Sequence, residues 1–390
     1  MAQYKYLIVG AGMTADAAVR GIRELDMEGE IGMIGSDHNP PYNRPPLTKA
    51  LWKGKPLESI WRGTQDLSVD LHLGRTVRSI DPDKKVVRDD QGVNYTYEIL
   101  LLATGGTPRK LPFGAEDIIY YRTLDDYHHL RELSNRLDHF GVIGGGFIGS
   151  EIAAALSMNG KKVTMFLPGA GIGAHIYPPE LSDYLTEYFR QKGVEVRSGV
   201  SVMDLQKRDG SYVLVTDHND KIPVDGVIAG IGIQPNIELA QSVGIKVGNG
   251  IVVDDNLQTS LPDIFAAGDV AEFRNPALGK RLRIEHEDNA NSMGKQAGRN
   301  MAGADEPYRH LSFFYSDLFE LGYEAVGDLD ARLETFVDWK DPFKKGVIYY
   351  LAGGRVRGVL LWNVWKSVDK ARALIAEPGP ITTTDLKGRL

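Results

Sequence analysis

The stretch Gly10-Ala11-Gly12-Met13-Thr14-Ala15 decides the fold of this chain, and Gly144-Gly145-Gly146-Phe147-Ile148-Gly149 repeats its pattern further along. Each stretch follows an apolar, strand-like run, at residues 6–9 and 139–143, and opens a helix-like run. Glycines in this setting let the backbone approach a pyrophosphate, which the N–H groups of the helix N-terminus bind. One such turn is weak evidence, because it also occurs in other α/β proteins. Two copies in the same setting predict two dinucleotide sites.

Composition limits what the chain can be. Its 390 residues allow two or three domains, and 42% hydrophobic with 25% charged residues is typical of a globular protein. The net charge of -7, with scattered basic residues, argues against a nucleic-acid partner. No apolar run reaches the roughly 18 residues of a membrane helix. The two glycine-rich stretches are here called the first fingerprint (residues 10–15) and the second fingerprint (residues 144–149). The first begins too close to Met1 to leave room for a targeting peptide, so we expect a cytoplasmic protein without a membrane partner.

The chain contains no cysteine. A dithiol relay or a cysteine-sulfenate peroxidase therefore has no atoms with which to work. This fits a reducing compartment but does not require one.

Strand-like and helix-like runs give the domain organisation. Residues 4–34 predict one βαβ unit and residues 139–166 a second. From Pro307 onward, alternating aromatic and apolar strands and a helix near residues 367–375 replace this pattern. We therefore expect an α/β fold with two Rossmann-like dinucleotide-binding domains and a smaller C-terminal α+β domain. The expected boundaries are 1–112 with 247–306 for the first domain, 113–246 for the second and 307–390 for the third.

Three further segments carry local signals. The proline-dense residues 39–47 predict either a rigid loop that holds a side chain in place or a plain surface linker. Residues 99–102 predict a buried strand, and the small residues 103–106 after it leave room for a phosphate or another backbone. A second short strand ends in an acid at Asp269.

Together these motifs resemble the FAD/NAD(P)-dependent pyridine nucleotide oxidoreductases, flavoproteins with two dinucleotide-binding domains that include ferredoxin and rubredoxin reductases and apoptosis-inducing factors. The resemblance covers the whole chain. It is carried by residues 41–49, 103–109, 144–151, 264–269, 316–318 and 322–327. The C-terminal runs 346–351 and 361–363 resemble the apoptosis-inducing factors more than typical ferredoxin reductases.

The resemblance implies that the first fingerprint holds FAD and the second NADH or NADPH. Asp269 would bind the flavin ribityl chain, and Arg44 and Arg122 would lie along the FAD. The other implied cofactor-binding residues are Gly10, Gly12, Ala15, Val77, Ala103, Thr104, Gly105, Gly145, Gly146, Ile148 and Gly232.

Three residues are the candidates for catalysis. Lys49 ends the proline loop, and Glu151 lies just beyond the second fingerprint, so we expect a buried ion pair near flavin N5. By the same resemblance, Phe147 covers the flavin face until nicotinamide displaces it. The alternatives are a surface lysine, a glutamate at a helix start and a core phenylalanine.

Four more residues match family positions around the two rings. Tyr315 replaces a tryptophan that lies against the nicotinamide, and Glu324 matches a glutamate that contacts its carboxamide. His286 and Glu287 open an expected helix over residues 284–301, whose N-terminus would stabilise negative charge on the reduced flavin. Because family members often carry two histidines there, Glu287 favours a backbone role over a side-chain role.

Both ribose sites depart from the usual pattern. The acid expected after the second strand of the first unit is absent, so the FAD ribose contact is either Ser36 or Asp37. The corresponding strand of the second unit runs into residues 166–169 without any acid. The choice between NADH and NADPH therefore stays open.

The resemblance implies an FAD-dependent NAD(P)H oxidoreductase. Hydride would pass from the nicotinamide to flavin N5, and electrons would go on to an acceptor such as ferredoxin or rubredoxin, a small iron-sulfur partner. The alternative is a redox-sensing flavoprotein whose dimerisation depends on flavin reduction. A homodimer is possible in both cases, and we expect no metal site. The long insertion that apoptosis-inducing factors carry before Gly346 is nearly absent here.

Overall fold

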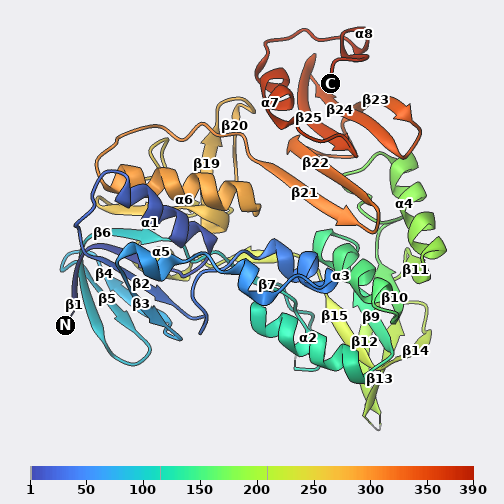
Figure 1. Ribbon diagram of the computed structural model, residues 1–390, viewed down its shortest axis with the longest axis horizontal. Helices are drawn as coiled ribbons and strands as arrows, with labels where there is room; N and C mark the ends of the chain where they lie inside the picture. The colour runs from blue at the N-terminus through green and yellow to red at the C-terminus, as the bar shows by residue number, and fades with distance from the viewer. Residues whose placement is uncertain (1, 115, 209) are drawn as a thin grey trace. The chain divides into compact units, whose positions relative to one another are not determined.

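The computed structural model describes residues 2–114, 116–208 and 210–390, and the chain divides into two compact units (Figure 1). The first unit contains Met1–Arg44, Pro56–Thr107 and Gln234–Ser312. The second contains Pro45–Lys55, Pro108–Ile233 and Phe313–Leu390. The short segment 45–55 therefore belongs to the second unit, although the chain on either side of it belongs to the first.

The first unit is built on a seven-stranded sheet. Its strands are β1 (Ala2–Val9), β2 (Ile31–Gly35), β3 (Val69–Leu73), β4 (Val77–Asp81), β5 (Val86–Asp89), β6 (Asn94–Leu102) and β18 (Ile264–Ala266). The order is β3-β2-β1-β6-β5-β4, with β18 also paired to β6. β1, β2, β3, β6 and β18 run parallel, and β4 and β5 form an antiparallel extension. Because residues 6–9 are buried throughout, β1 is a central strand covered on both faces.

The other elements of this unit are shorter or lie on the sheet. They are α1 (Met13–Arg23), α5 (Glu238–Ser242), α6 (Glu287–Met301), β17 (Ile251–Val252), β19 (Ala271–Asn275), β20 (Lys280–Leu282) and the 3-10 helices η3 (Leu57–Ile60), η4 (Thr64–Leu67) and η5 (Gly268–Val270).

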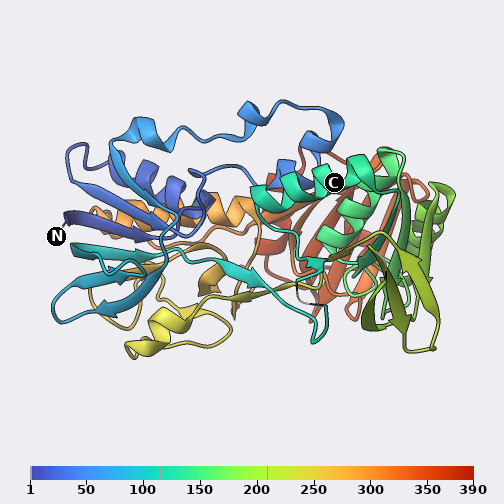
Figure 2. The same cartoon turned by 90° about the horizontal axis from the view of Figure 1, so that it is seen from below.

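Close packing of α1 on α6 fixes the region around the first fingerprint. The two helices lie side by side in both views (Figures 1 and 2). A Cβ placed on Gly298 would lie 2.0 Å from the carbonyl oxygen of Ala18, and one on Gly294 would lie 2.3 Å from that of Thr14. Only glycine permits this approach. α6 begins at Glu287, three residues later than the sequence predicts.

The second unit contains a five-stranded parallel sheet of the Rossmann type. Its order is β11 (Val194–Ser198), β10 (Lys162–Leu167), β9 (His139–Ile143), β15 (Gly226–Ala229) and β8 (Ile118–Ile119). The accompanying helices are α2 (Leu124–Arg136), α3 (Phe147–Met158) and α4 (Pro179–Gln191). A small antiparallel sheet follows, made of β12 (Val202–Arg208), β13 (Ser211–Thr216) and β14 (Lys221–Val224). The short strands β7 (Gly106–Pro108) and β16 (Ile233–Pro235) fall where the chain passes from one unit to the other.

The C-terminal part of the second unit is a five-stranded antiparallel sheet, drawn in orange to red in Figure 1. Its order is β21 (Phe313–Leu318), β22 (Leu321–Gly327), β25 (Arg355–Trp362), β24 (Lys345–Ala352) and β23 (Glu334–Asp341). α7 (Val368–Ala376) packs on β22 and β25, and α8 (Thr383–Leu386) follows. The expected fold class is thus confirmed. Within the described ranges, no helix has the length and apolar character needed to cross a bilayer.

Candidate functional site

Lys49 and Glu151 form a buried ion pair in the second unit. The ammonium Nζ of Lys49 lies 2.6 Å from Glu151 Oε2, and the two side chains are 11% and 3% exposed. Lys49 lies between the 3-10 helices η1 (Pro45–Thr48) and η2 (Ala50–Lys53), and Glu151 is the fifth residue of α3. The structure therefore brings together the two residues that the sequence pairs.

Glu151 has two further hydrogen-bond donors that sequence reasoning missed. The Thr48 hydroxyl donates to Oε2 at 2.6 Å, and the Ser316 hydroxyl donates to Oε1 at 2.6 Å. Both hydroxyl-bearing residues are buried. Hydrogen bonds of this kind stabilise the ionised carboxylate. The only sequence signal was that Thr48 and Ser316 fall inside motifs shared with the family.

The loop that carries Lys49 is clamped in place. The carbonyl oxygen of Leu47 accepts hydrogen bonds from the Trp52 indole at 2.8 Å and from the Tyr121 hydroxyl at 2.5 Å. Arg131 on α2 lies over the Trp52 ring, with its guanidinium carbon 4.9 Å from the ring centroid. Asn159, at the end of α3, donates to the Trp52 carbonyl. Leu47, the last residue of the proline-dense segment, and Trp52, which follows Lys49, are thus held by side-chain contacts.

Aromatic and acidic side chains lie near the ion pair. The Lys49 ammonium is 5.3 Å from the ring centroid of Tyr315, which lies opposite Glu324 in the β21–β22 register. Phe147 opens α3, and its ring packs edge-on against Phe314, with centroids 5.3 Å apart. Glu324 Oε2 is buried and has no hydrogen-bond partner, and burial raises the pKa of this carboxyl above its usual range. An unpaired buried acceptor fits a ligand that supplies an N–H donor.

The second fingerprint forms an open cradle at the start of α3. Gly146 caps the helix without a side-chain hydrogen bond, and a Cβ placed there would meet nothing within 4 Å. Gly145 packs close to Leu167, Ile148 is exposed, and Gly232 accepts a hydrogen bond from the Arg109 backbone. The glycine at the cap leaves room beside the N-terminus of α3, which fits a pyrophosphate.

The first fingerprint forms a similar cradle in the first unit. Gly10 has a φ of +123°, and a Cβ there would lie 2.1 Å from the carbonyl oxygen of Ala103, so only glycine fits. Gly12 caps α1 without a side-chain hydrogen bond, and Arg44 Nη2 is 3.9 Å from its Cβ position. Ala15 is buried on α1. A helix N-terminus beside an arginine fits a bound anion such as the FAD pyrophosphate.

The other predicted residues of the first unit surround this cradle or support it. Ser36 is exposed after β2, whereas both Asp37 oxygens accept protein hydrogen bonds, from Asn39 and from Tyr42. Thr104 exchanges hydrogen bonds with Asn236, and the Gly105 carbonyl accepts from the Asn236 backbone. Sequence reasoning missed this asparagine. Val77 is buried in the hydrophobic core at the start of β4.

Asp269 and the start of α6, which the resemblance places near the flavin, are also in the first unit. Asp269 follows β18 in η5, and its carbonyl accepts from Arg283. His286 is the N-cap of α6 and Glu287 is its first residue, so these two residues open the helix, which starts later than the expected residue 284. Burial lowers the pKa of His286 to about 4, so its ring is neutral at pH 7. Arg122 belongs to the second unit, where it precedes the Thr123 cap of α2.

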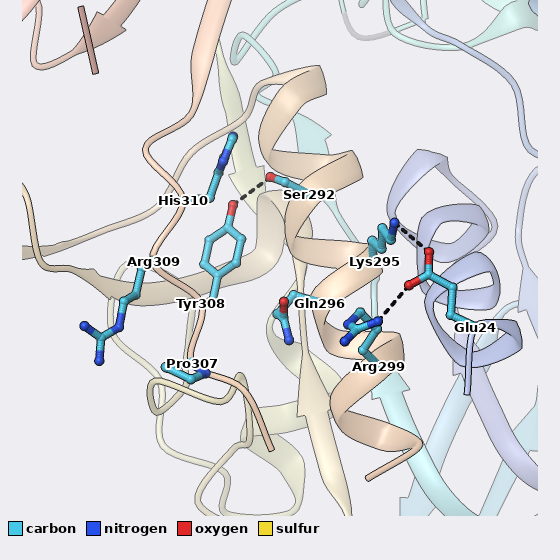
Figure 3. Close-up of a pocket in the computed structure, with 9 residues that line it drawn as sticks. All are labelled: Glu24, Ser292, Lys295, Gln296, Arg299, Pro307, Tyr308, Arg309 and His310. Carbon is cyan, nitrogen blue, oxygen red and sulfur yellow. Dashed lines mark hydrogen bonds and ion pairs between the residues drawn. The ribbon is translucent and has the colours of Figure 1, made fainter. Parts of the chain in front are cut away.

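A cavity of about 370 Å³ lies elsewhere in the first unit, along the outer face of α6 (Figure 3). Lys295 and Arg299 both point to Glu24, and Ser292 meets the Tyr308 hydroxyl. No predicted site residue lines this cavity, and the Glu24 carboxylate pairs with both cations. In the described part of the chain, no group of three histidine or carboxylate side chains could hold a metal.

Comparison with known proteins gives the family. Residues 4–294 match the family described as pyridine nucleotide-disulphide oxidoreductase, and residues 297–341 and 337–377 match the C-terminal region of apoptosis-inducing factor. The chain is 35% identical over 417 residues to apoptosis-inducing factor 1 of Dictyostelium discoideum, covering 96% of this chain and 78% of that protein. It is 32% identical over 390 residues to putidaredoxin reductase of Pseudomonas putida, covering 96% and 92%.

A solved structure agrees with these matches. The covalent putidaredoxin reductase-putidaredoxin complex aligns with a TM-score of 0.91 and 30% identity, over 98% of this chain and 95% of that chain. This family uses FAD and NAD(P)H, and the two open glycine cradles fit both dinucleotides. Each unit carries one of the two glycine-rich strand-to-helix turns, in agreement with these matches, and this chain belongs to the pyridine nucleotide-disulphide oxidoreductase family.

Proposed function

We propose that this protein oxidises NADH or NADPH, passes hydride to the N5 atom of bound FAD, and delivers the electrons singly to a small iron-sulfur protein of the ferredoxin or rubredoxin type. The observation that carries the proposal is the buried ion pair of Lys49 and Glu151 on the helix that the second fingerprint opens. Hydride transfer needs alignment rather than a general acid or base, which suits a fixed ion pair.

The residues of the first unit would bind FAD. The N-terminus of α1 and the Arg44 guanidinium would hold the pyrophosphate, and Asp269 the ribityl chain. Neutral His286 would add no charge of its own at the start of α6. FAD supplies the chemistry, because it accepts a hydride and releases electrons one at a time.

The residues of the second unit would bind and orient the nicotinamide. Glu324 Oε2 would accept from the carboxamide N–H, and the rings of Phe147 and Tyr315 would bound the nicotinamide and exclude water. Lys49, held by Glu151, would keep its ammonium in one place beside these rings.

Boundaries and ribose contacts belong to the same proposal. We assign residues 1–112 and 247–306 to an FAD-binding domain, 113–246 to an NAD(P)H-binding domain and 307–390 to the C-terminal domain. Ser36 is the better candidate for the FAD ribose, because both Asp37 oxygens already accept protein hydrogen bonds. The choice between NADH and NADPH stays open.

The absence of cysteine and the relatives both support the electron route. Without a dithiol, electrons leave from the flavin itself. One similar protein is a putidaredoxin reductase, and the similar solved structure holds it together with putidaredoxin. A cytoplasmic location fits such a partner.

A second candidate function is a redox-sensing flavoprotein whose dimerisation responds to NADH. The match of the C-terminal region to apoptosis-inducing factor favours it. Against it, residues 342–344 join β23 directly to β24, so this chain lacks a long segment there that reduction could release.

Electron delivery and association state separate the two candidates. Purified holoenzyme with NADH and a ferredoxin or rubredoxin should reduce cytochrome c at a rate that depends on the iron-sulfur protein, while size-exclusion elution stays the same with and without NADH. A shift in elution on reduction, together with no electron delivery to either iron-sulfur protein, would establish the sensor instead.

A further inference from the structure

Both oxygens of the Glu151 carboxylate are held, and they are held by different segments. Lys49 and Thr48, from the clamped loop, bind Oε2. Ser316, from β21, binds Oε1. Ser316 is 1% exposed, so water does not compete for this hydrogen bond. The orientation of the carboxylate, and with it the place of the Lys49 ammonium, therefore depends on β21 as well as on the loop.

Two buried tyrosines lie next to Ser316. Tyr323 on β22 is paired with Ser316 in the β21–β22 register, and the Tyr177 hydroxyl donates to the Tyr323 hydroxyl at 2.9 Å. Both phenols are buried. Burial, together with the nearby charge of Glu151, raises the pKa of each well above its usual range, so both stay protonated. Two protonated phenols thus lie beside the residue that donates to the Glu151 carboxylate.

Aromatic packing holds the two tyrosine side chains in place. The Tyr323 ring stacks on Trp362 at an interplanar angle of 14°, with centroids 5.7 Å apart, and Tyr177 meets both rings edge-on. All three rings are 3% exposed or less. The hydroxyl that reaches Glu151 Oε1 is therefore attached to a rigid part of the C-terminal sheet.

We propose that Ser316 is a positioning residue for hydride transfer, acting through Glu151. The proposal rests on the proposed function of the Lys49–Glu151 pair. Without the hydroxyl donor of Ser316, the Glu151 carboxylate can rotate about its Cγ–Cδ bond. The Lys49 ammonium then no longer has a partner that is held in one position. The nicotinamide would still bind, because Ser316 is not among its proposed contacts, but the bound complex would be aligned less often.

The test compares Ser316→Ala with Ser316→Thr in the FAD-loaded protein. Ser316→Ala should lower the limiting rate of anaerobic flavin reduction by NADH about tenfold, the effect of one lost charge-assisted hydrogen bond. The dissociation constant of NADH should stay the same, and Ser316→Thr, which keeps the hydroxyl, should restore most of the rate. The control is Ser134→Ala, because Ser134 is equally buried and donates to a helix carbonyl of α2.

Two further measurements show whether Ser316 acts through Glu151. In a Glu151→Gln background, Ser316→Ala should add no further loss. A crystal structure of the Ser316→Ala protein should show the carboxylate rotated and the contact between Lys49 Nζ and Oε2 lengthened. A wild-type rate in Ser316→Ala, an equal loss in the Glu151→Gln background, or an unchanged ion pair in the crystal would each overturn the proposal. If neither NADH nor NADPH reduces the wild-type flavin, the proposed function fails, and the crystal structure still decides whether Ser316 positions Glu151.

Discussion

Lys49 Nζ lies 2.6 Å from Glu151 Oε2, although 102 residues separate them in the chain. Both side chains are almost fully removed from water. A buried pair of this kind adds little net stability, but removing one partner leaves an uncompensated charge. We propose that the fixed geometry of the pair aligns the nicotinamide.

Replacing Lys49 should damage the reaction more than it damages FAD binding. Lys49→Ala should slow flavin reduction by NADH at least tenfold and lower the free energy of unfolding by about 3 kcal/mol. Stopped-flow spectroscopy and the flavin content of the purified variant measure the two effects. Lys53→Ala is the control, because Lys53 lies on the same loop, is 47% exposed and is 3.9 Å from its nearest acid, Asp317. Loss of FAD with an unchanged reduction rate would show that Lys49 serves the flavin site instead.

The two hydrogen bonds to the Leu47 carbonyl oxygen should also affect the reaction rate, because they hold the loop that carries Lys49. Tyr121→Phe removes one of two donors to the Leu47 carbonyl and should cost about 1 kcal/mol of stability. Because the clamped loop carries Lys49, the limiting reduction rate should also fall. Thermal unfolding and stopped-flow reduction test this, with Tyr127→Phe as the control on the neighbouring helix. A normal rate in Tyr121→Phe would show that the Trp52 donor alone holds the loop.

The ionised Glu324 carboxylate should lower the stability of the protein and strengthen the binding of the nucleotide. Burial raises the pKa of its carboxyl above the usual 4.5, so its contribution to stability is full below that pH and is lost as the pH rises through the raised value. Glu324→Gln should therefore stabilise the protein relative to wild type at pH 8 but not at pH 4, by about 1 kcal/mol. It should also weaken NADH binding about tenfold, because a neutral amide oxygen is a poorer acceptor.

Thermal unfolding at the two pH values and titration with NADH check both effects. Stabilisation by Glu324→Gln that is equal at pH 4 and pH 8 would contradict the ionisation argument. Unchanged NADH affinity would remove Glu324 from the proposed nicotinamide contacts.

His286 should make the protein sensitive to acid. Because burial lowers its pKa from 6.5 to about 4, its contribution to stability is present above pH 6.5 and is lost as the pH falls through 4. His286→Gln removes this dependence, so between pH 7 and pH 4 the variant should lose less stability than wild type, by about 2 kcal/mol. Urea unfolding of the FAD-loaded proteins at both pH values measures the difference. Parallel losses in the two proteins would contradict the neutral, buried state of the ring.

Local signals predict most of the fold. Gly10 and Gly144 fix the two strand-to-helix turns, because their positive φ angles and close approaches to a neighbouring carbonyl oxygen exclude side chains. The pairing of Lys49 with Glu151 came from matching family motifs, since the sequence alone gives no sign that a loop residue reaches a helix 102 positions away.

Other features depend on contacts between residues that are far apart in the sequence, which no local sequence pattern predicts. The Ser316 hydroxyl reaches Glu151 only because β21 lies beside α3. The Tyr177–Tyr323 contact joins residues 146 positions apart. α6 begins at Glu287 rather than at 284, because His286 has the extended backbone conformation of an N-cap and is not one of the residues that mark a cap in sequence.

The most direct test of the central claim is anaerobic stopped-flow mixing of the FAD-loaded protein with NADH and, separately, with NADPH, followed by a second mixing with oxidised ferredoxin or rubredoxin. The account predicts that at least one nucleotide bleaches the flavin band rapidly and that the iron-sulfur protein restores it without a persistent long-wavelength band. A flavin that neither nucleotide reduces, or a reduced complex that is stable toward both iron-sulfur proteins, would contradict it.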